Sequence, residues 1–216
     1  MKQDFWSQRW AEGLTGFNQG EVNAYLKKYW PSLGLSAQAR VLVPLCGKSC
    51  DLLWLRAQGH AVVGVEFVPQ AVHEFFAENS IPYEPTSMGF RAMDDGPPLT
   101  FIVGDFLTLQ AHQVGPFDAV YDRASIVALP AAMQEAFAGT LDALMSAGSR
   151  GLLLSFEYPP AERQGPPFST DEACLRLRLA EHIELQPITR VALAPEEVAR
   201  FNVSWCFEAV YTLSWS

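Results

Sequence analysis

A glycine turn and an acid about twenty residues after it are the first features whose residue types and spacing suggest chemistry. The apolar run Val41–Val43 leads into Cys46-Gly47-Lys48, and a helix is expected directly afterwards. A strand that turns through glycine into a helix gathers backbone N–H groups where a ligand can approach closely. A second apolar run, 61–65, ends on Glu66. That spacing is typical of a nucleoside-binding site in which the acid accepts hydrogen bonds from ribose hydroxyls.

The same turn has other interpretations. Gly47-Lys48-Ser49 matches the end of a P-loop, but that motif requires glycine at position 42, where the chain has Leu42. The turn contains a single glycine, so the three-glycine dinucleotide fingerprint is absent as well. A strand, turn and helix that bind nothing remain an alternative, although a carboxylate that ends a buried strand needs partners.

Three more side chains could take part in catalysis. Asp105 follows a third apolar run, and Asp122 and Arg123 end a fourth. The carboxyl ends of parallel strands border the crevice in which ligands bind, so these residues should gather near Glu66. Cys46 is a candidate nucleophile because a helix start lowers the pKa of a thiol, but no histidine base is placed beside it.

An aromatic segment precedes the turn. Trp6 and Trp10 lie four positions apart and share one face if this segment is helical, and Phe5 and Phe17 extend the aromatic surface. One interpretation is a helix that docks onto the core. The other is a lid over a flat or cationic ligand, because aromatic faces attract cations.

The elements that must position these residues follow from the hydrophobic pattern, in which helices alternate with strands through residue 158 and a strand pair follows. The segment 80–98, rich in proline and glycine, should hold a short hairpin-like piece. This order predicts a doubly wound, mostly parallel α/β sheet with an antiparallel C-terminal edge strand and an N-terminal helical lid. Strands are expected at 41–43, 61–67, 99–106, 117–123, 151–156, 184–193 and 205–213, and helices at 19–30, 50–58, 69–79, 131–145 and from a cap at Ser169 to about residue 182.

Length and composition favour a single domain acting on a small molecule. The 216 residues should form one domain, with a lid and helix at 1–30, a nucleoside-binding core at 40–158 and a C-terminal helix and strand pair at 159–216. A net charge of −9 disfavours nucleic acids and anionic membranes as partners. We expect a monomer that binds no metal. Four cysteines without Cys-x-x-Cys pairs, no apolar signal-peptide core and no membrane-spanning run favour the cytoplasm.

Several strings then resemble one family. Val43-Pro44-Leu45-Cys46-Gly47-Lys48, followed by Gly59-His60-x-Val62-Val63-Gly64-Val65-Glu66, is similar to the thiopurine S-methyltransferase family. The resemblance spans essentially the whole chain and includes Trp6-x-x-x-Trp10, Phe17, Asp122-Arg123-x-x-x-Val127-Ala128, Gly165-Pro166-Pro167-Phe168 and Cys206-Phe207-Glu208-x-x-Tyr211. It implies a class I methyltransferase that uses S-adenosyl-L-methionine to methylate the sulfur of a small aromatic or heterocyclic thiol. Methylation of inorganic selenium or tellurium, a nicotinamide oxidoreductase of similar fold and a non-catalytic relative are the alternatives.

The resemblance also implies roles for individual residues. Toward the cofactor, Glu66 would hold the ribose hydroxyls, and backbone atoms of Leu45 and Gly47 would line the site. Asp105 and Phe106 would lie beside the adenine.

Near the methyl group, Trp10 and Trp6 would close over the methionine part of the cofactor. Phe17 would border the acceptor, and Phe168 is expected to surround it together with Trp6.

Asp122 and Arg123 are the best charged candidates near the transferred methyl. Arg123 would pair with the cofactor carboxylate or face the acceptor. Asp122 is either catalytic or a structural partner of Arg123. A thiol or selenol is acidic enough that no strong base is required, so the protein has mainly to align the reactants and exclude water.

Overall fold

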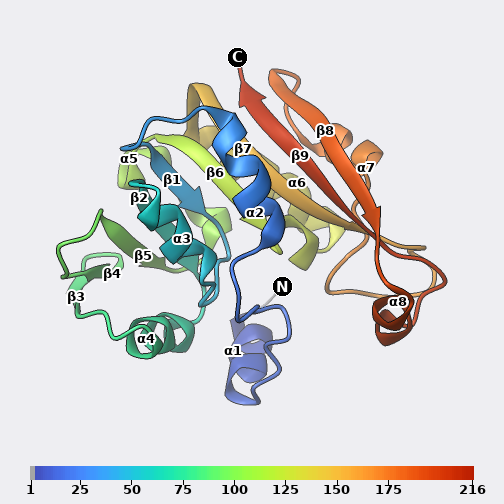
Figure 1. Cartoon of the computed structure of the whole chain (residues 1–216), viewed down its shortest axis with the longest axis horizontal. Coiled ribbons are helices and arrows are strands. Elements are labelled where there is room, and N and C mark those ends of the chain that lie inside the picture. Colours follow the sequence, from blue (N-terminus) through green and yellow to red (C-terminus); the bar gives the residue numbers. More distant parts are fainter. Residues whose placement is uncertain (1–2) are drawn as a thin grey trace.

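The computed structural model describes residues 3–216, which form a nine-stranded sheet with helices on both faces (Figure 1). Residues 1 and 2 of the predicted N-terminal segment lie outside the described part of the chain. The strand order is β3-β4-β5-β2-β1-β6-β7-β9-β8. The strands are β1 (Arg40–Val43), β2 (Ala61–Glu66), β3 (Tyr83–Thr86), β4 (Gly89–Ala92), β5 (Leu99–Val103), β6 (Phe117–Arg123), β7 (Met145–Glu157), β8 (Ile183–Ala192) and β9 (Phe207–Trp215).

The centre of the sheet is parallel and both edges are antiparallel. β5, β2, β1, β6 and β7 pair in parallel. The hairpin of β3 and β4 adds to β5, and β9 lies antiparallel between β7 and β8. The predicted mixed sheet with an antiparallel C-terminal edge is therefore confirmed, and the hairpin lies within the segment 80–98.

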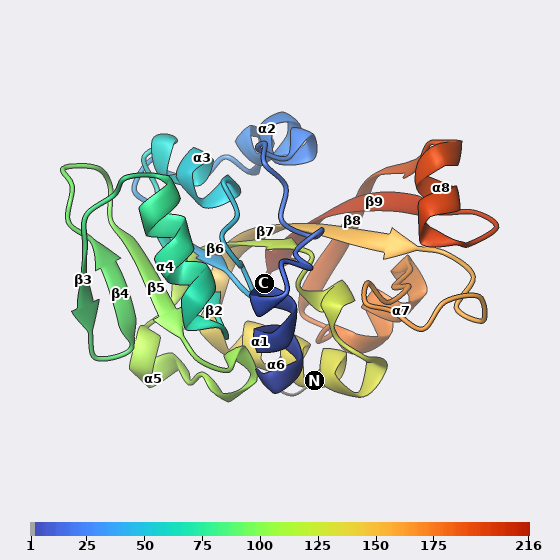
Figure 2. The same cartoon turned by 90° about the horizontal axis from the view of Figure 1, so that it is seen from below.

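Two layers of helices cover the sheet, with α2, α3 and α4 on one face and α5, α6 and α7 on the other (Figure 2). The helices are α1 (Gln3–Ala11), α2 (Ala24–Tyr29), α3 (Asp51–Ala57), α4 (Pro69–Glu78), α5 (Ala111–Val114), α6 (Ala131–Leu144), α7 (Glu172–Arg178) and α8 (Pro195–Phe201). No helix within residues 3–216 is both long enough and apolar enough to cross a membrane.

Strand β1 shows why an apolar run gives this architecture. Successive side chains of a strand point to opposite faces of the sheet. Leu42 packs into one hydrophobic cluster, with Phe137 of α6, whereas Val41 and Val43 pack into the other, with Leu52 of α3. A strand buried on both sides needs apolar residues at consecutive positions, as parallel central strands have.

The predicted helix start at Ser169 is wrong. The Ser169 hydroxyl donates to the Tyr158 carbonyl at 2.7 Å and accepts the Tyr158 N–H at 3.0 Å. Asp171 is the cap instead, because its carboxylate accepts the Cys174 N–H at 2.8 Å. The helix α7 begins at Glu172 and ends at Arg178, four residues before the predicted end.

Two other helices differ from the sequence-based expectation. The predicted helix 19–30 is reduced to α2, which Asn23 caps by accepting the N–H groups of Tyr25 and Leu26, and a 3₁₀ turn follows at Trp30–Leu33. Helix α8 was not predicted. The apolar side chains among its seven residues are at most partly buried, and the helix is too short to show the apolar periodicity from which a helix is inferred.

Candidate active site

A cavity of about 390 Å³ lies at the carboxyl ends of the central strands. The N-terminal segment, the strand-end loops, the loop after β7 and helix α8 all contribute to its walls. Its lining includes Trp6, Arg9, Trp10, Phe17, Asn18, Gln19, Leu45, Cys46, Asp51, Glu66, Asp105, Phe106, Tyr121, Arg123, Met133, Ser155, Phe156, Arg163, Pro166, Pro167, Arg200, Phe201 and Glu208.

Glu66 lines this cavity and fixes the glycine turn beside it, where Leu45 and Cys46 belong to the lining but Gly47, predicted to line the cofactor, does not. Its buried carboxylate accepts the Gly47 N–H and the Val68 N–H, each at 2.7 Å. Burial raises the pKa of Glu66, and the backbone hydrogen bonds oppose that rise. Gly47 has φ +55°, and a Cβ there would lie 3.3 Å from the Trp10 ring, so glycine satisfies both the turn and the aromatic contact.

Cys46 is not placed as a nucleophile. Burial raises the pKa of this thiol well above its ordinary value, with the Glu66 carboxylate adding to the rise. The thiolate is thus disfavoured at neutral pH, opposite to the effect expected from a helix start alone. The helix α3 also begins later than expected, with Cys50 at its N-cap position and no side-chain cap.

Asp105 and Phe106 lie side by side on the cavity wall. The Asp105 carboxylate accepts the Leu107 N–H at 3.0 Å and so caps the 3₁₀ turn Phe106–Thr108. Phe106 is buried and packs against Phe137, with ring centroids 4.8 Å apart. Both residues predicted to lie beside an adenine therefore border the same space as Glu66.

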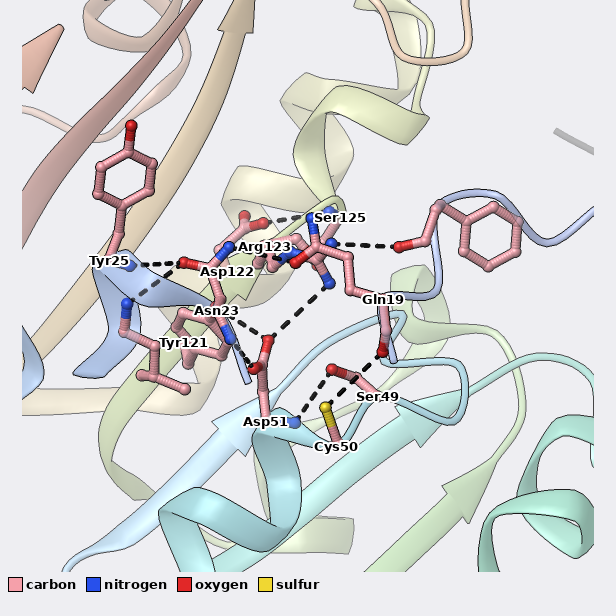
Figure 3. A network of polar contacts seen from close by, with 12 residues as sticks. Gln19, Asn23, Tyr25, Ser49, Cys50, Asp51, Tyr121, Asp122, Arg123 and Ser125 are labelled. Atoms are coloured by element: carbon pink, nitrogen blue, oxygen red, sulfur yellow. Dashed lines mark hydrogen bonds and ion pairs between the residues drawn. The ribbon is translucent and has the colours of Figure 1, made fainter. Parts of the chain in front are cut away.

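A polar network surrounds Arg123 (Figure 3). The Arg123 Nη2 donates to the Phe17 carbonyl at 3.2 Å, and its Nη1 lies 3.8 Å from Asp51 Oδ2. The same Asp51 oxygen accepts the Tyr121 hydroxyl at 3.1 Å, and Asp51 Oδ1 accepts the Asn23 N–H at 2.8 Å. Sequence reasoning missed Asp51, whose only signal was its place as an acid at the start of the helix after the glycine turn.

Asp122, predicted as a catalytic candidate, is fully buried and lies outside the cavity lining. Its Oδ1 accepts the N–H groups of Ser125 and Ile126, each at 3.3 Å, and its Oδ2 has no hydrogen-bond partner. Desolvation raises the pKa of Asp122 to about 6. Within residues 3–216, the carboxylate that forms an ion pair with Arg123 is that of Asp51, not that of Asp122.

The N-terminal aromatic residues form one wall of the cavity. Trp6 and Trp10 project from α1 and meet Phe17 edge-to-face, with centroid separations of 5.6 and 5.8 Å. Trp10 is buried against Val68 and Ala71 at the start of α4. The segment thus docks onto the core and lines the cavity, so the two interpretations of the sequence are compatible.

Three charged residues of the C-terminal part of the chain also line the cavity, although no sequence motif singled them out as site residues. They are Arg163, Arg200 and Glu208, and Arg163 donates to the carbonyl of Phe201 at 3.0 Å. Burial raises the pKa of Glu208, whereas Arg123 lowers it.

Phe168 does not line the cavity, although Pro166 and Pro167 do. Its N–H donates to the Val127 carbonyl at 2.6 Å, which ties the loop to the chain after β6.

Solved structures share this fold. A Burkholderia thailandensis 1,6-didemethyltoxoflavin-N1-methyltransferase with bound S-adenosylhomocysteine superposes with a TM-score of 0.64 at 16% identity, covering 98% of this chain and 87% of that one. Magnesium protoporphyrin IX methyltransferase from Synechocystis PCC 6803 superposes with a TM-score of 0.65 at 15% identity, covering 99% and 97%. The fold is that of a class I methyltransferase.

Sequence relatives identify the family within the class I methyltransferases to which this chain belongs. The family model for thiopurine S-methyltransferase matches residues 1–216. A thiopurine S-methyltransferase of Xanthomonas campestris pv. campestris is 52% identical over 174 residues, which are 80% of this chain and 79% of that protein. One from Pseudomonas fluorescens is 41% identical over 217 residues, covering 99% and 97%. The chain belongs to the thiopurine S-methyltransferase family.

Proposed function

We propose that this protein transfers the methyl group of S-adenosyl-L-methionine to the sulfur of a small aromatic or heterocyclic thiol. The observation that carries the proposal is that one cavity is lined both by the strand-end acid Glu66, which holds the glycine turn, and by the aromatic residues Trp6, Trp10 and Phe17. Membership of the thiopurine S-methyltransferase family gives the reaction type and the acceptor atom.

The cofactor-binding roles fit the hydrogen-bonding capacity of the residues present. Each oxygen of Glu66 already accepts one backbone N–H, and a carboxylate oxygen has a second lone pair for a ribose hydroxyl. Backbone atoms of Leu45 and Gly47 would line the nucleoside, with Asp105 and Phe106 beside the adenine. The guanidinium of Arg123 suits the cofactor carboxylate, because Arg123 lines the cavity and a guanidinium can donate two parallel hydrogen bonds to a carboxylate.

The acceptor would lie under the aromatic wall, between the cofactor and the loop 159–168. Trp6, Trp10 and Phe17 offer flat apolar surfaces for a planar ring and keep water from the reacting atoms. The bound sulfonium supplies a methyl group that is already activated for displacement. The work left to the chain is to hold the thiol sulfur in line with that methyl group.

No residue is assigned as a base. A thiolate acceptor has no proton to remove, and Asp122 is separated from the cavity by its burial. We propose instead that Asp122 holds the turn that carries Arg123, through the N–H groups of Ser125 and Ile126.

A methyl-transfer assay with radiolabelled S-adenosylmethionine tests the proposal. Thiophenol and a thiopurine should be methylated at sulfur, and an oligonucleotide should not, because the chain carries a net charge of −9. Selenite and tellurite arms test the alternative acceptors, and calorimetry with NADH tests the oxidoreductase alternative. Turnover of selenite or tellurite without turnover of any thiol would replace the acceptor class, and NADH binding without S-adenosylmethionine binding would overturn the proposal.

A further inference from the structure

We infer that Asp51 is a positioning residue whose carboxylate both orients Arg123 and fastens the segment 17–23 over the cavity. The inference rests on the proposed function for the role of Arg123 toward the cofactor. It assigns Asp51 no contact with the reacting atoms.

The first observation is how completely Asp51 is enclosed. It is the first residue of α3, is 1% exposed and receives donors from two directions. The Asn23 N–H donates to one oxygen, and the Tyr121 hydroxyl donates to the other. Figure 3 shows the carboxylate between Asn23, Tyr121 and Arg123. A buried carboxylate held by several donors has one orientation, so it provides a fixed negative charge.

The second observation is the distance to Arg123. At 3.8 Å, the Nη1 of Arg123 is close enough to Asp51 for attraction but is not hydrogen-bonded to it. Asp51 therefore attracts the guanidinium without taking up its Nη1 donors, which stay available for a bound carboxylate, while Nη2 donates to the Phe17 carbonyl. Glu208 also acts electrostatically on Arg123, but it is only half-buried.

The third observation is that the segment 17–23 is attached at both ends to this ion pair. At one end the Phe17 carbonyl accepts from Arg123, and at the other the Asn23 N–H donates to Asp51. Asn18 and Gln19, between these attachments, line the cavity. Loss of the Asp51 charge should therefore loosen the segment and misplace the guanidinium together.

Asp51→Asn tests the inference with little change of shape. Asp118→Asn is the matched control, because the Asp118 carboxylate also accepts a backbone N–H, that of Arg40 at 2.7 Å, outside the cavity. Affinity for S-adenosylhomocysteine is measured by calorimetry, hydrogen exchange of residues 3–22 by mass spectrometry, and KM and kcat with thiophenol. A merely structural role would lower the melting temperature but leave the Kd and KM of the folded enzyme unchanged.

We expect D51N to raise the Kd about tenfold, as for the loss of one charge-assisted contact, and to speed exchange in residues 3–22. D118N should change neither. The inference would be overturned if D51N kept the Kd and the exchange rates of the wild type. It would also be overturned if D118N changed both quantities as much as D51N does.

If D51N does not fold, Arg123→Lys supplies the test. A lysine ammonium lacks the fork that spans Asp51 and the Phe17 carbonyl, so exchange of residues 3–22 should still accelerate. Unchanged hydrogen exchange in R123K would contradict the inference that Arg123 and Asp51 hold the segment 17–23 in place. If the wild-type protein binds no S-adenosylhomocysteine, the proposed function fails, whereas exchange in the ligand-free variants still decides the role of Asp51.

Discussion

At the scale of single residues, Glu66 links two backbone segments. Its two oxygens connect the glycine turn after β1 to the start of α4, at 2.7 Å each. A carboxylate held in this way is oriented before a ribose arrives, so little conformational entropy is lost when the ligand binds.

Glu66→Ala should therefore weaken S-adenosylmethionine binding by about 1.5–3 kcal/mol, the value of hydrogen bonds to a charged group. Calorimetric titration of a variant that circular dichroism shows to be folded gives the measurement. Glu84→Ala, on β3 and outside the cavity, is the control and should bind as the wild type does. An unchanged Kd in E66A would remove Glu66 from the ribose site.

Asp122 should make stability depend on pH with a predictable sign. Its pKa is about 6 in the folded protein, raised by burial, against about 3.9 in an unfolded chain. The folded state therefore binds a proton that the unfolded state has lost between these two pKa values. The contribution of Asp122 to the free energy of unfolding is fully present below about pH 4 and is lost as the pH rises through 6, and the loss is at most about 3 kcal/mol. Asp122→Asn should flatten the thermal stability profile between pH 4.5 and 7.5. A slope equal to that of the wild type would contradict the assignment.

At the scale of elements, α1 is both a packed helix and a wall of the cavity. Deleting residues 1–17 should leave a folded sheet, because the first strand begins at Arg40. Turnover should fall at least about a hundredfold as water enters the site. Circular dichroism and the thiophenol assay measure the two effects.

Two point variants separate these roles of α1. Trp6→Ala removes a ring that lines the cavity, whereas Phe5→Ala removes a ring that is 37% exposed and outside the lining. W6A should lose activity and F5A should retain it. Near-normal turnover in the truncated protein would show that the segment only packs.

How far the sequence predicted each element depended on burial. β1 and β2 were found because consecutive apolar residues are required where both faces of a strand are covered. Helix α8 was missed because it is only seven residues long and has no fully buried side chain. Ser169 was mistaken for a helix cap because Ser and Asp are equally good caps. The Ser169 hydroxyl is instead bonded to the backbone of Tyr158, a contact that the local sequence does not reveal.

The site residues also divide into those that the local sequence pattern reveals and those that depend on contacts with distant parts of the chain. Glu66, Asp105 and Arg123 could be predicted because Glu66 and Arg123 end strands and Asp105 lies two residues after one, where α/β sheets bind ligands. Asp51 and Arg163 could not, since their partners come from segments 28 and 38 positions away in the chain. Asp122 was wrongly expected in the cavity for a similar reason. The sequence pattern of the strand does not reveal the turn after β6 that encloses the Asp122 side chain.

At the scale of the whole molecule, the reaction should follow the chemistry of the acceptor. With no base assigned in the cavity, the rate should rise with pH until the acceptor thiol is ionised, and the midpoint should shift with the thiol's own pKa. A pH–rate series over thiols of different acidity is the measurement. A midpoint that stays fixed across the series would reveal an enzyme base.

The position of β9 affects synthesis on the ribosome. β9 follows β8 in the chain but lies between β7 and β8, and β8 pairs with β9. As the chain leaves the exit tunnel, β8 therefore emerges before the strand that holds it, and β7 exposes an unpaired edge with Leu152 and Leu154. Translation that stalls between these two strands would leave a nascent chain open to strand exchange with its neighbours on the same messenger.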